Sequence, residues 1–335
     1  MSLWAVTSYF NPLGWSSRLR NYRCFRRHLA APLATVEWHP DGAFELGPGD
    51  ADLLVQVRGG ELMWQKERLL NLAIARLPPA AEHVAWLDCD VVLERADWPA
   101  LAARALEMHR AVQLFSGVDY LDEERTRQLA GETGAGAPPA RPPLDGLVVS
   151  SAKLVAEIGP ARLVEIDLAG HSGVRRTAPS LPRSPGIGWA ARRSLLERTP
   201  FFDRAIVGSG DWLWMLAALG ESRRWLSAAS ALGYSYFAGT SFEPWADATA
   251  AAFEGRLGYL EQTARHLFHG AIGDRRYKAR HGAFARLSID IERDIVESAP
   301  GGPWSFAGPA PECREFMARY FRERREDGVL PLTPG

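Results

Sequence analysis

Apolar, strand-like runs alternate with helix-like patterns over the first 115 residues, and this alternation constrains the fold more than any other feature. The strand-like runs lie at 3–10, 33–38, 52–57, 83–88 and 111–115. Helical spacing of apolar residues predicts helices over 16–30, 61–77 and 97–109. Strands separated by helices form mostly parallel sheets with helices on both faces, so the expected class is α/β.

Two carboxylates interrupt one of these runs. In "HVAWLDCDVV" (83–92), an apolar strand ends in Asp88 and Asp90, and apolar residues resume at Val91. Such a pair can bind a divalent cation, divide acid and base roles, or cap the next helix in solvent. Ligands of α/β sheets bind at the carboxyl ends of strands, and burying two unpaired acids is costly. The context therefore implies a metal ion or a cationic partner.

Composition limits the class of partner and the compartment. The chain has 335 residues and a formal net charge of −1, so no global field favours nucleic acid. Three widely spaced cysteines fit no disulfide framework and indicate the cytoplasm. We expect no signal peptide at the N-terminus, and no apolar run of about eighteen residues predicts a membrane span.

The second half of the chain is less regular. The Gly- and Pro-rich stretch 131–143 is expected to be a loop. In 185–203, a glycine-rich segment is expected to lead into a short helix. A helix is predicted over 211–220, which Asp211 can cap. The stretch 256–270 fits either a helix or a strand, and 274–287 and 311–327 are predicted to be helical.

Three segments together resemble a known enzyme family. "WQKERLLNLAIARLP", "AWLDCDVV" and "PGIGWAARRSLLERTPFFDRAIVGSGDWLW" are similar to GT-A-fold glycosyltransferases, most of all to family 2-like and galactosyl- or N-acetylgalactosaminyltransferase-like members. The resemblance covers about residues 3–290. It implies a glycosyltransferase domain over 1–270, with a nucleotide-binding half (1–115) and an acceptor half (144–270). A helical C-terminal extension, 271–335, is expected to follow.

The resemblance also implies an activity. The chain is expected to move a sugar from a nucleotide-sugar donor, most commonly a UDP-sugar, to the hydroxyl of an unknown acceptor, which is a glycan, a lipid or a small molecule. Inversion at the anomeric carbon is expected, and retention becomes the alternative if Asp211 is not positioned as the base. In such enzymes the D-x-D motif binds Mn²⁺ or Mg²⁺, which holds the donor diphosphate. A late histidine often adds a third ligand. The metal ligands expected here are Asp88, Asp90 and His269, which matches that place better than His266.

The remaining site residues follow from the same resemblance. Asp211, at the end of "GSGD", is the expected general base, although many relatives carry Glu-Asp there. Residues expected near the donor are Thr7, Ser8, Asn11, Arg18, Gln65, Arg68, Asn71 and Asp88. Residues expected near the sugar or acceptor are Gly188, Trp189, Gly210 and Trp212. Lys66 and Glu67 are expected on the solvated face of their helix, and Trp214 in the core.

Two other functions stay open. A haloacid dehalogenase-like phosphotransferase also carries D-x-D at a strand end, but it needs a later lysine and a further acidic pair. Lys153 is a candidate lysine, and no convincing acidic pair follows. A non-catalytic protein that binds nucleotide-sugars or glycans is the other alternative. Asp88, Asp90, Asp211 and His269 together argue against it, whereas Asp203 is expected only to cap a turn.

Overall fold

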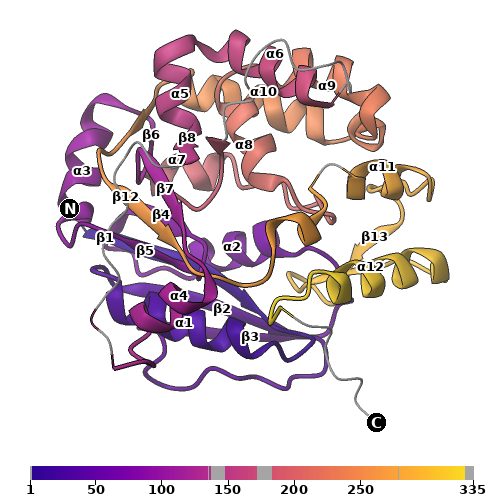
Figure 1. The fold of residues 1–335 in the computed structure, drawn as a ribbon. Helices are drawn as coiled ribbons and strands as arrows, with labels where there is room; N and C mark the ends of the chain where they lie inside the picture. The colour runs from indigo at the N-terminus through magenta and orange to yellow at the C-terminus, as the bar shows by residue number, and fades with distance from the viewer. Residues whose placement is uncertain (1, 135, 137–147, 172–182, 278, 329–335) are drawn as a thin grey trace.

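A seven-stranded, largely parallel sheet forms the centre of the molecule (Figure 1). The structure is a computed structural model, and it describes residues 2–134, 136, 148–171, 183–277 and 279–328. In spatial order the strands are β11 (Leu257–Tyr259), β6 (Ala111–Gln113), β10 (Gly188–Arg192), β4 (Ala81–Leu87), β1 (Ser2–Phe10), β2 (Leu33–His39) and β3 (Leu53–Arg58). Only β10 runs antiparallel to its neighbours. The α/β class expected from the alternation is confirmed.

Both faces of this sheet are apolar and covered by helices. Along β4, Val84 and Trp86 belong to one buried cluster, and Ala85 and Leu87 belong to the other, because successive side chains of a strand point to opposite faces. The second face packs on α1 (Ser16–His28) and α3 (Trp98–Met108). The first packs on α2 (Lys66–Ala75), α7 (Arg193–Arg198), α8 (Gly210–Ala218) and α10 (Phe242–Phe253).

A second sheet crosses the carboxyl edge of the first. Its strands, in order, are β5 (Val91–Leu93), β12 (Thr263–His266), β7 (Gly117–Tyr120), β8 (Val148–Ser150) and β9 (Arg183–Ser184). The D-x-D segment lies between the two sheets, because β4 ends at Leu87 and β5 begins at Val91. His266 ends β12, which pairs with β5. Pairing of β5 with β12 therefore brings Asp90 and His266 together from distant parts of the sequence.

The remaining helices lie around these sheets. They are α4 (Glu123–Leu129), α5 (Ser151–Ile158), α6 (Pro160–His171) and α9 (Ser222–Ala229), with short 3-10 turns η1 (Ser230–Leu232) and η2 (Ser235–Phe237). In Figure 1, α5, α6, α9 and α10 form one group at the top of the view, and α1 and α4 lie in its lower half. No helix among the described residues is both long and apolar enough to cross a membrane.

The C-terminal segment is only partly helical. It contains η3 (Ile272–Arg275), α11 (Ala279–Ala285), a hairpin of β13 (Ile295–Glu297) and β14 (Trp304–Phe306), and α12 (Pro311–Glu323). Helices form within both stretches where they were expected, 274–287 and 311–327, and the hairpin between them was not expected. Its β14 packs against Met63 and α12 in a small separate apolar cluster. Gln65 fixes β14 to the main body, since its side chain bonds the backbone N–H and C=O of Trp304 at 2.7 and 3.0 Å.

Several element boundaries differ from the expected ones. The helix predicted over 61–77 begins only at Lys66, and the ambiguous stretch 256–270 forms two strands. Asp211 does not cap α8, because Ser209 is the N-cap residue and Asp211 lies in the first turn. The loop predicted over 131–143 lies mostly outside the described residues.

Candidate active site

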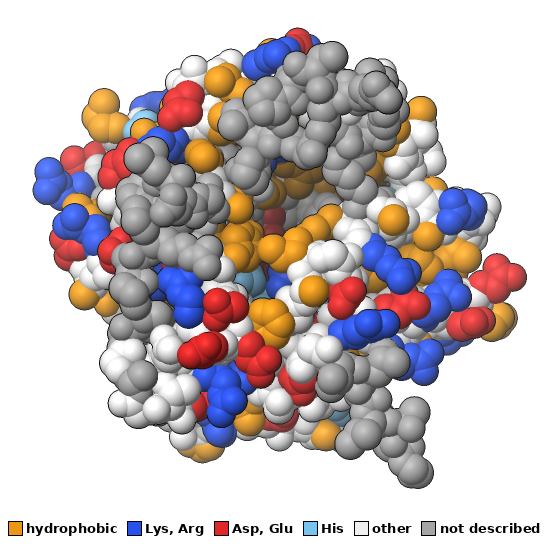
Figure 2. All heavy atoms as spheres, in the orientation of Figure 1, with side chains coloured by type: hydrophobic (Ala, Val, Ile, Leu, Met, Phe, Trp, Pro, Cys, Tyr) orange, Lys and Arg blue, Asp and Glu red, His pale blue; other side chains and the backbone are white. Residues whose placement is uncertain are grey.

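A cavity of about 470 Å³ lies where β1 and β4 end, at the carboxyl edge of the parallel strands. Ser8 and Phe10 line it from β1, and Asp88, Cys89 and Asp90 from the segment after β4. The first turns of α2 and α8 also face it. Figure 2 shows the hollow from outside, with acidic side chains at its base.

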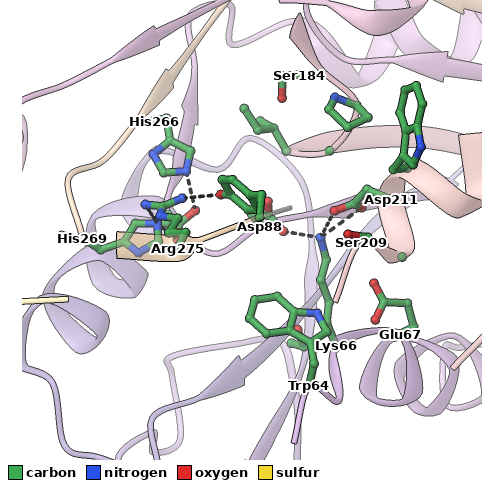
Figure 3. A pocket seen from close by; sticks show the side chains of 18 of the residues that line it. Trp64, Lys66, Glu67, Asp88, Ser184, Ser209, Asp211, His266, His269 and Arg275 are labelled. Carbon is green, nitrogen blue, oxygen red and sulfur yellow. Dashed lines mark hydrogen bonds and ion pairs between the residues drawn. The ribbon is translucent and has the colours of Figure 1, made fainter. Parts of the chain in front are cut away.

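Lys66 joins two carboxylates on one side of this cavity. Its Nζ lies 2.6 Å from Asp88 Oδ1 and 2.8 Å from Asp211 Oδ2 (Figure 3). Burial alone would lower the pKa of Lys66, but Asp211 and Asp88 hold it well above its ordinary value. Burial and the neighbouring Asp211 raise the pKa of Asp88 to about 6. We call Lys66, Glu67, Asp88 and Asp211 the lysine cluster.

Glu67 belongs to this cluster through very close packing. A Cβ atom on Gly210 would lie 2.0 Å from Glu67 Oε1, so only glycine leaves room for this carboxyl group. Burial, reinforced by Asp211, raises the pKa of Glu67 to about 8, which keeps the group protonated at neutral pH. The expectation that Lys66 and Glu67 face solvent was wrong. They are 7% and 5% exposed because α2 begins at Lys66 and its first turn faces the cavity.

Asp90 and two histidines form a second cluster. Asp90 Oδ2 lies 3.0 Å from His269 Nε2, and Asp90 Oδ1 lies 3.8 Å from His266 Nε2. Burial lowers the pKa of His266 to about 3, and burial and Arg275 lower that of His269 to about 4. Burial opposes ionisation of Asp90, but the two imidazoles and Arg18 hold its pKa below the ordinary range. We call Asp90, His266 and His269 the imidazole cluster.

The imidazole cluster fits a divalent cation. One ligand atom from each residue lies within 4.8 Å of the others, and all three residues are buried. Within the described structure, Asp90 Oδ1 and His269 Nδ1 are buried without a hydrogen-bond partner. A carboxylate and two neutral imidazoles are a donor set for divalent transition metals. The group differs from the predicted set, since it contains His266 and leaves Asp88 with Lys66.

Some of the predicted site residues are brought together at the cavity. Those that line it are Ser8, Arg18, Asp88, Asp90, Gly210, Asp211, Trp212 and His269. Arg18 lies 3.7 Å from Asp90, so it neutralises part of the charge of the imidazole cluster. The indole of Trp212 faces the guanidinium of Arg183 at 5.2 Å.

Seven other predicted residues do not line the cavity. They are Thr7, Asn11, Gln65, Arg68, Asn71, Gly188 and Trp189. Thr7 donates to Leu87 O at 2.7 Å, and Asn71 bonds the backbone of Phe201 in both directions. Their polar side chains satisfy buried backbone groups, a structural use that sequence spacing does not distinguish from ligand binding.

Local packing also explains most of the other predicted residues that do not line the cavity. Asn11 closes the turn before α1 through Trp15. Arg68 bonds Asp203 at 3.2 Å, so Asp203 pairs with a guanidinium and not only with a turn. Gly188 lets β10 approach Leu87, since a Cβ there would lie 3.1 Å from its side chain. Trp189 is fully buried against Trp214 at 5.0 Å, in the core where only Trp214 was expected.

Residues after His269 line the cavity with basic side chains that were not predicted from the sequence. Arg275, Arg280 and Arg324 line the cavity together with Tyr277. Arg275 Nη2 donates to His269 Nε2 at 2.8 Å, and Arg280 lies 5.2 Å from the ring of Tyr277. Two of these arginines belong to the stretch "DRRYKAR" (274–280), which begins five residues after the predicted metal ligand His269. This short distance along the chain was the signal in the sequence that could have placed them at the cavity.

Comparison with known proteins gives similarity at the level of structure only. No protein-family model matches the chain, and no curated protein matches its sequence. Several solved structures are similar to it at low sequence identity. One is mannosyltransferase PcManGT from Pyrobaculum calidifontis in complex with GDP-Man and Mn²⁺, with 14% identity, a TM-score of 0.40, and coverage of 98% of this chain and 76% of that chain.

Two further solved structures are similar to a comparable degree. Glucosyl-3-phosphoglycerate synthase from Mycobacterium tuberculosis, in complex with Mn²⁺, UDP and phosphoglyceric acid, shares 12% identity, a TM-score of 0.37, and coverage of 86% and 78%. S. aureus TarS 1-349 in complex with UDP-GlcNAc shares 11% identity, a TM-score of 0.37, and coverage of 96% and 72%.

Proposed function

We propose that this chain is a metal-dependent glycosyltransferase that uses a nucleotide-sugar donor. The observation that carries the proposal is the meeting of two clusters in one cavity. The imidazole cluster offers a cation site, and the lysine cluster offers a carboxylate, Asp211, within the same cavity. Asp88 and Asp90, one residue apart, belong to different clusters and connect them.

The basic residues beside the imidazole cluster suit a diphosphate. Asp90, His266 and His269 would hold Mn²⁺ or Mg²⁺, which when bound neutralises the negative charge of the leaving nucleoside diphosphate. Arg18 and Arg275, both facing the cavity, are placed to bind its phosphate oxygens. A UDP-sugar is the expected donor from the sequence resemblance.

Asp211 is the proposed general base. It lies in the first turn of α8 with its carboxylate held by Lys66. An acceptor hydroxyl that loses its proton to Asp211 can attack the anomeric carbon, and direct attack inverts that centre. Trp212, the next residue, offers an indole edge at the cavity for a sugar. The three cysteines are free and buried, which supports the cytoplasm as the proposed compartment.

The phosphotransferase alternative receives less support. Lys153 pairs with Glu261 at 3.5 Å and does not line the cavity. Lys66 is the lysine beside Asp88, but it precedes the D-x-D segment and also binds Asp211. A non-catalytic binding protein shares the same donor site, so only turnover distinguishes it.

The test is thermal unfolding with a panel of nucleoside diphosphates, each with and without Mn²⁺. A ligand at a hundred times its dissociation constant adds about 2.7 kcal/mol to the unfolding free energy. We expect one nucleotide to stabilise the wild type only with Mn²⁺, and Asp90→Ala to lose this effect. Asp97→Ala is the matched control, since Asp97 is an exposed aspartate paired with Arg95.

Turnover then separates the three functions. Slow release of free sugar from the stabilising nucleotide-sugar, abolished in Asp90→Ala, is expected of the glycosyltransferase. Binding without any sugar release, with or without glycan acceptors, would favour the non-catalytic protein. Stabilisation by no nucleotide, together with hydrolysis of a generic phosphate ester, would replace the proposal by the phosphotransferase.

A further inference from the structure

The end of the described chain returns to the imidazole cluster and is fixed there. α1 begins after Trp15, a residue without a side-chain acceptor for the free backbone N–H groups of the first turn. Asp327 supplies that acceptor, since its two carboxylate oxygens bond the N–H groups of Ser16 and Ser17 at 2.9 and 2.8 Å. Ser17 in turn donates its hydroxyl to the carbonyl of Glu326 at 3.0 Å.

The chain after His269 touches the same segment. Gly270 has a φ of +86°, and a Cβ there would lie 2.6 Å from Arg325 O and 2.9 Å from Arg324 O. Any side chain at position 270 would therefore push the two segments apart. The backbone next to a candidate metal ligand is thus packed directly on residues more than fifty positions later.

Between these contacts Glu326 is buried and aimed at the cluster. Its side chain is 3% exposed. It pairs with Arg324 at 2.6 Å and with Arg18, whose guanidinium also lies 3.7 Å from Asp90. Glu326 Oε2, the oxygen that pairs with Arg18, lies 3.9 Å from His269 Nδ1, and Nδ1 has no hydrogen-bond partner within the ranges that the structure describes.

The contact of His269 with Arg275 places the proton of the imidazole. A guanidinium has only donors, so the 2.8 Å contact with Arg275 makes His269 Nε2 an acceptor, in competition with the carboxylate of Asp90, which lies 3.0 Å from the same nitrogen and would prefer a hydrogen there. The proton of the neutral ring is then on Nδ1, toward Glu326. In this tautomer the lone pair is on Nε2, the nitrogen 3.0 Å from Asp90, and a bound cation would take that lone pair over from Arg275.

We infer that Glu326 is a positioning residue of the imidazole cluster, which orients His269 through Nδ1 and Arg18 through its guanidinium. The inference rests on the proposed function, because it assumes that the cluster binds a divalent cation. It adds that the C-terminal segment 324–327 completes the cation site. Metal-ligating histidines generally need such an acceptor on the second ring nitrogen, and its loss costs about 10–100-fold in metal affinity.

The test compares two Glu→Gln variants by calorimetric titration of the metal-free protein with Mn²⁺. Glu326→Gln keeps the shape of the side chain and removes its charge, and we expect Mn²⁺ to bind about tenfold more weakly. Glu323→Gln is the matched control three residues earlier, where Glu323 pairs with the half-exposed Arg276 at 2.8 Å. This control should bind Mn²⁺ as the wild type does.

A second readout follows the tautomer directly. The ¹⁵N spectrum of the metal-free wild type should show His269 protonated at Nδ1, and Glu326→Gln should show a mixture of the two tautomers. Equal Mn²⁺ affinity of wild type and Glu326→Gln, or a wild type protonated at Nε2, would overturn the inference. Absence of Mn²⁺ binding by the wild type itself would instead remove the metal from the proposed function.

A variant with a shorter acidic side chain serves as the control for misfolding. If circular dichroism shows that Glu326→Gln is unfolded, Glu326→Asp keeps the charge between Arg18 and Arg324 and withdraws the carboxylate from His269 by one methylene. It should fold and still bind Mn²⁺ more weakly than the wild type. Wild-type affinity in a folded Glu326→Asp would count against the positioning role.

Discussion

The two clusters of the cavity differ in how their charges are compensated. In the lysine cluster, Asp88 and Asp211 share the ammonium of Lys66 at 2.6 and 2.8 Å, and their side chains are 28% and 25% exposed. In the imidazole cluster, Asp90 is 7% exposed and its nearest cation, Arg18, lies 3.7 Å away. Asp90 Oδ1 and His269 Nδ1 have no hydrogen-bond partner among the described residues.

This difference indicates a division of labour. A partly exposed carboxylate with a resident cation can exchange partners with an incoming hydroxyl, which suits acid–base chemistry. A buried anion beside two neutral imidazoles needs an added cation, which suits a metal site.

The largest effect is expected from Asp211→Asn, which removes the proposed base and keeps the shape of its side chain. Turnover of the nucleotide-sugar with an acceptor should fall by about 10²–10⁴-fold, the usual contribution of a general base. Mn²⁺-dependent stabilisation by the nucleotide should persist, because the imidazole cluster is intact. Steady-state rates and thermal unfolding measure the two properties, with the exposed Asp247→Asn as control. Unchanged turnover would mean that another group takes the proton.

The next effect is expected from Lys66→Met, which leaves Asp88 and Asp211 without their shared cation. Breaking such a buried arrangement should lower the unfolding free energy by about 3 kcal/mol. Urea denaturation measures the loss, and Lys153→Met, at a half-exposed surface pair, should change little. Adding Asp211→Asn to Lys66→Met should restore part of the stability. Strictly additive losses would show that the two side chains do not interact.

Local sequence patterns predicted the sheet and the place of the acid pair. Apolar runs separated by helical spacing are local signals, and the carboxyl end of a buried strand is a general position for ligands. Asp88, Asp90, Asp211 and His269 all line the cavity, as the motif order suggested. The alternation did not reveal β13 and β14, two three-residue strands without a distinct period.

Partners that depend on tertiary packing were not predictable in the same way. Gln65, Arg68 and Asn71 lie on or beside α2 like Lys66 and Glu67, yet they fix the backbone while Lys66 and Glu67 reach the cavity. Whether a side chain of this segment fixes the backbone or reaches the cavity depends on where α2 begins and on how α8 packs against it. Sequence patterns do not fix the first residue of a helix. The helix predicted from residue 61 begins at Lys66, and it is this first turn that faces the cavity.

A smaller effect is expected from Glu67→Gln, and its size should depend on pH. The folded protein raises the pKa of Glu67 from an ordinary 4.5 to about 8, so the unfolded chain loses this proton first as pH rises. The contribution of protonated Glu67 to the unfolding free energy of the wild type is fully present below pH 4.5 and is lost as the pH rises toward 8. Glutamine removes that loss, so the variant should be more stable than the wild type at pH 7.5.

Urea denaturation at pH 4.5 and pH 7.5 measures this difference. At pH 4.5 the wild type and Glu67→Gln should be nearly equal in stability, because Glu67 is then protonated in the folded state and about half protonated in the unfolded chain. Glu61→Gln, a partly exposed change before the same helix where Glu61 pairs with Arg314, is the control and should show a smaller pH dependence. A Glu67→Gln variant that is less stable than wild type at pH 7.5 would mean that Glu67 is ionised beside Lys66.

The smallest effect is expected from Mn²⁺ alone, and it separates the clusters most sharply. At ten times its dissociation constant, Mn²⁺ should raise the unfolding free energy of the wild type by about 1.4 kcal/mol. His266→Asn should lose this gain, because His266 belongs to the group of three ligand atoms around Asp90. Asp88→Asn should retain it, because Asp88 pairs with Lys66. Loss of the gain in Asp88→Asn, with retention in His266→Asn, would restore the ligand set predicted from the D-x-D motif and make Lys66 the group displaced by the metal.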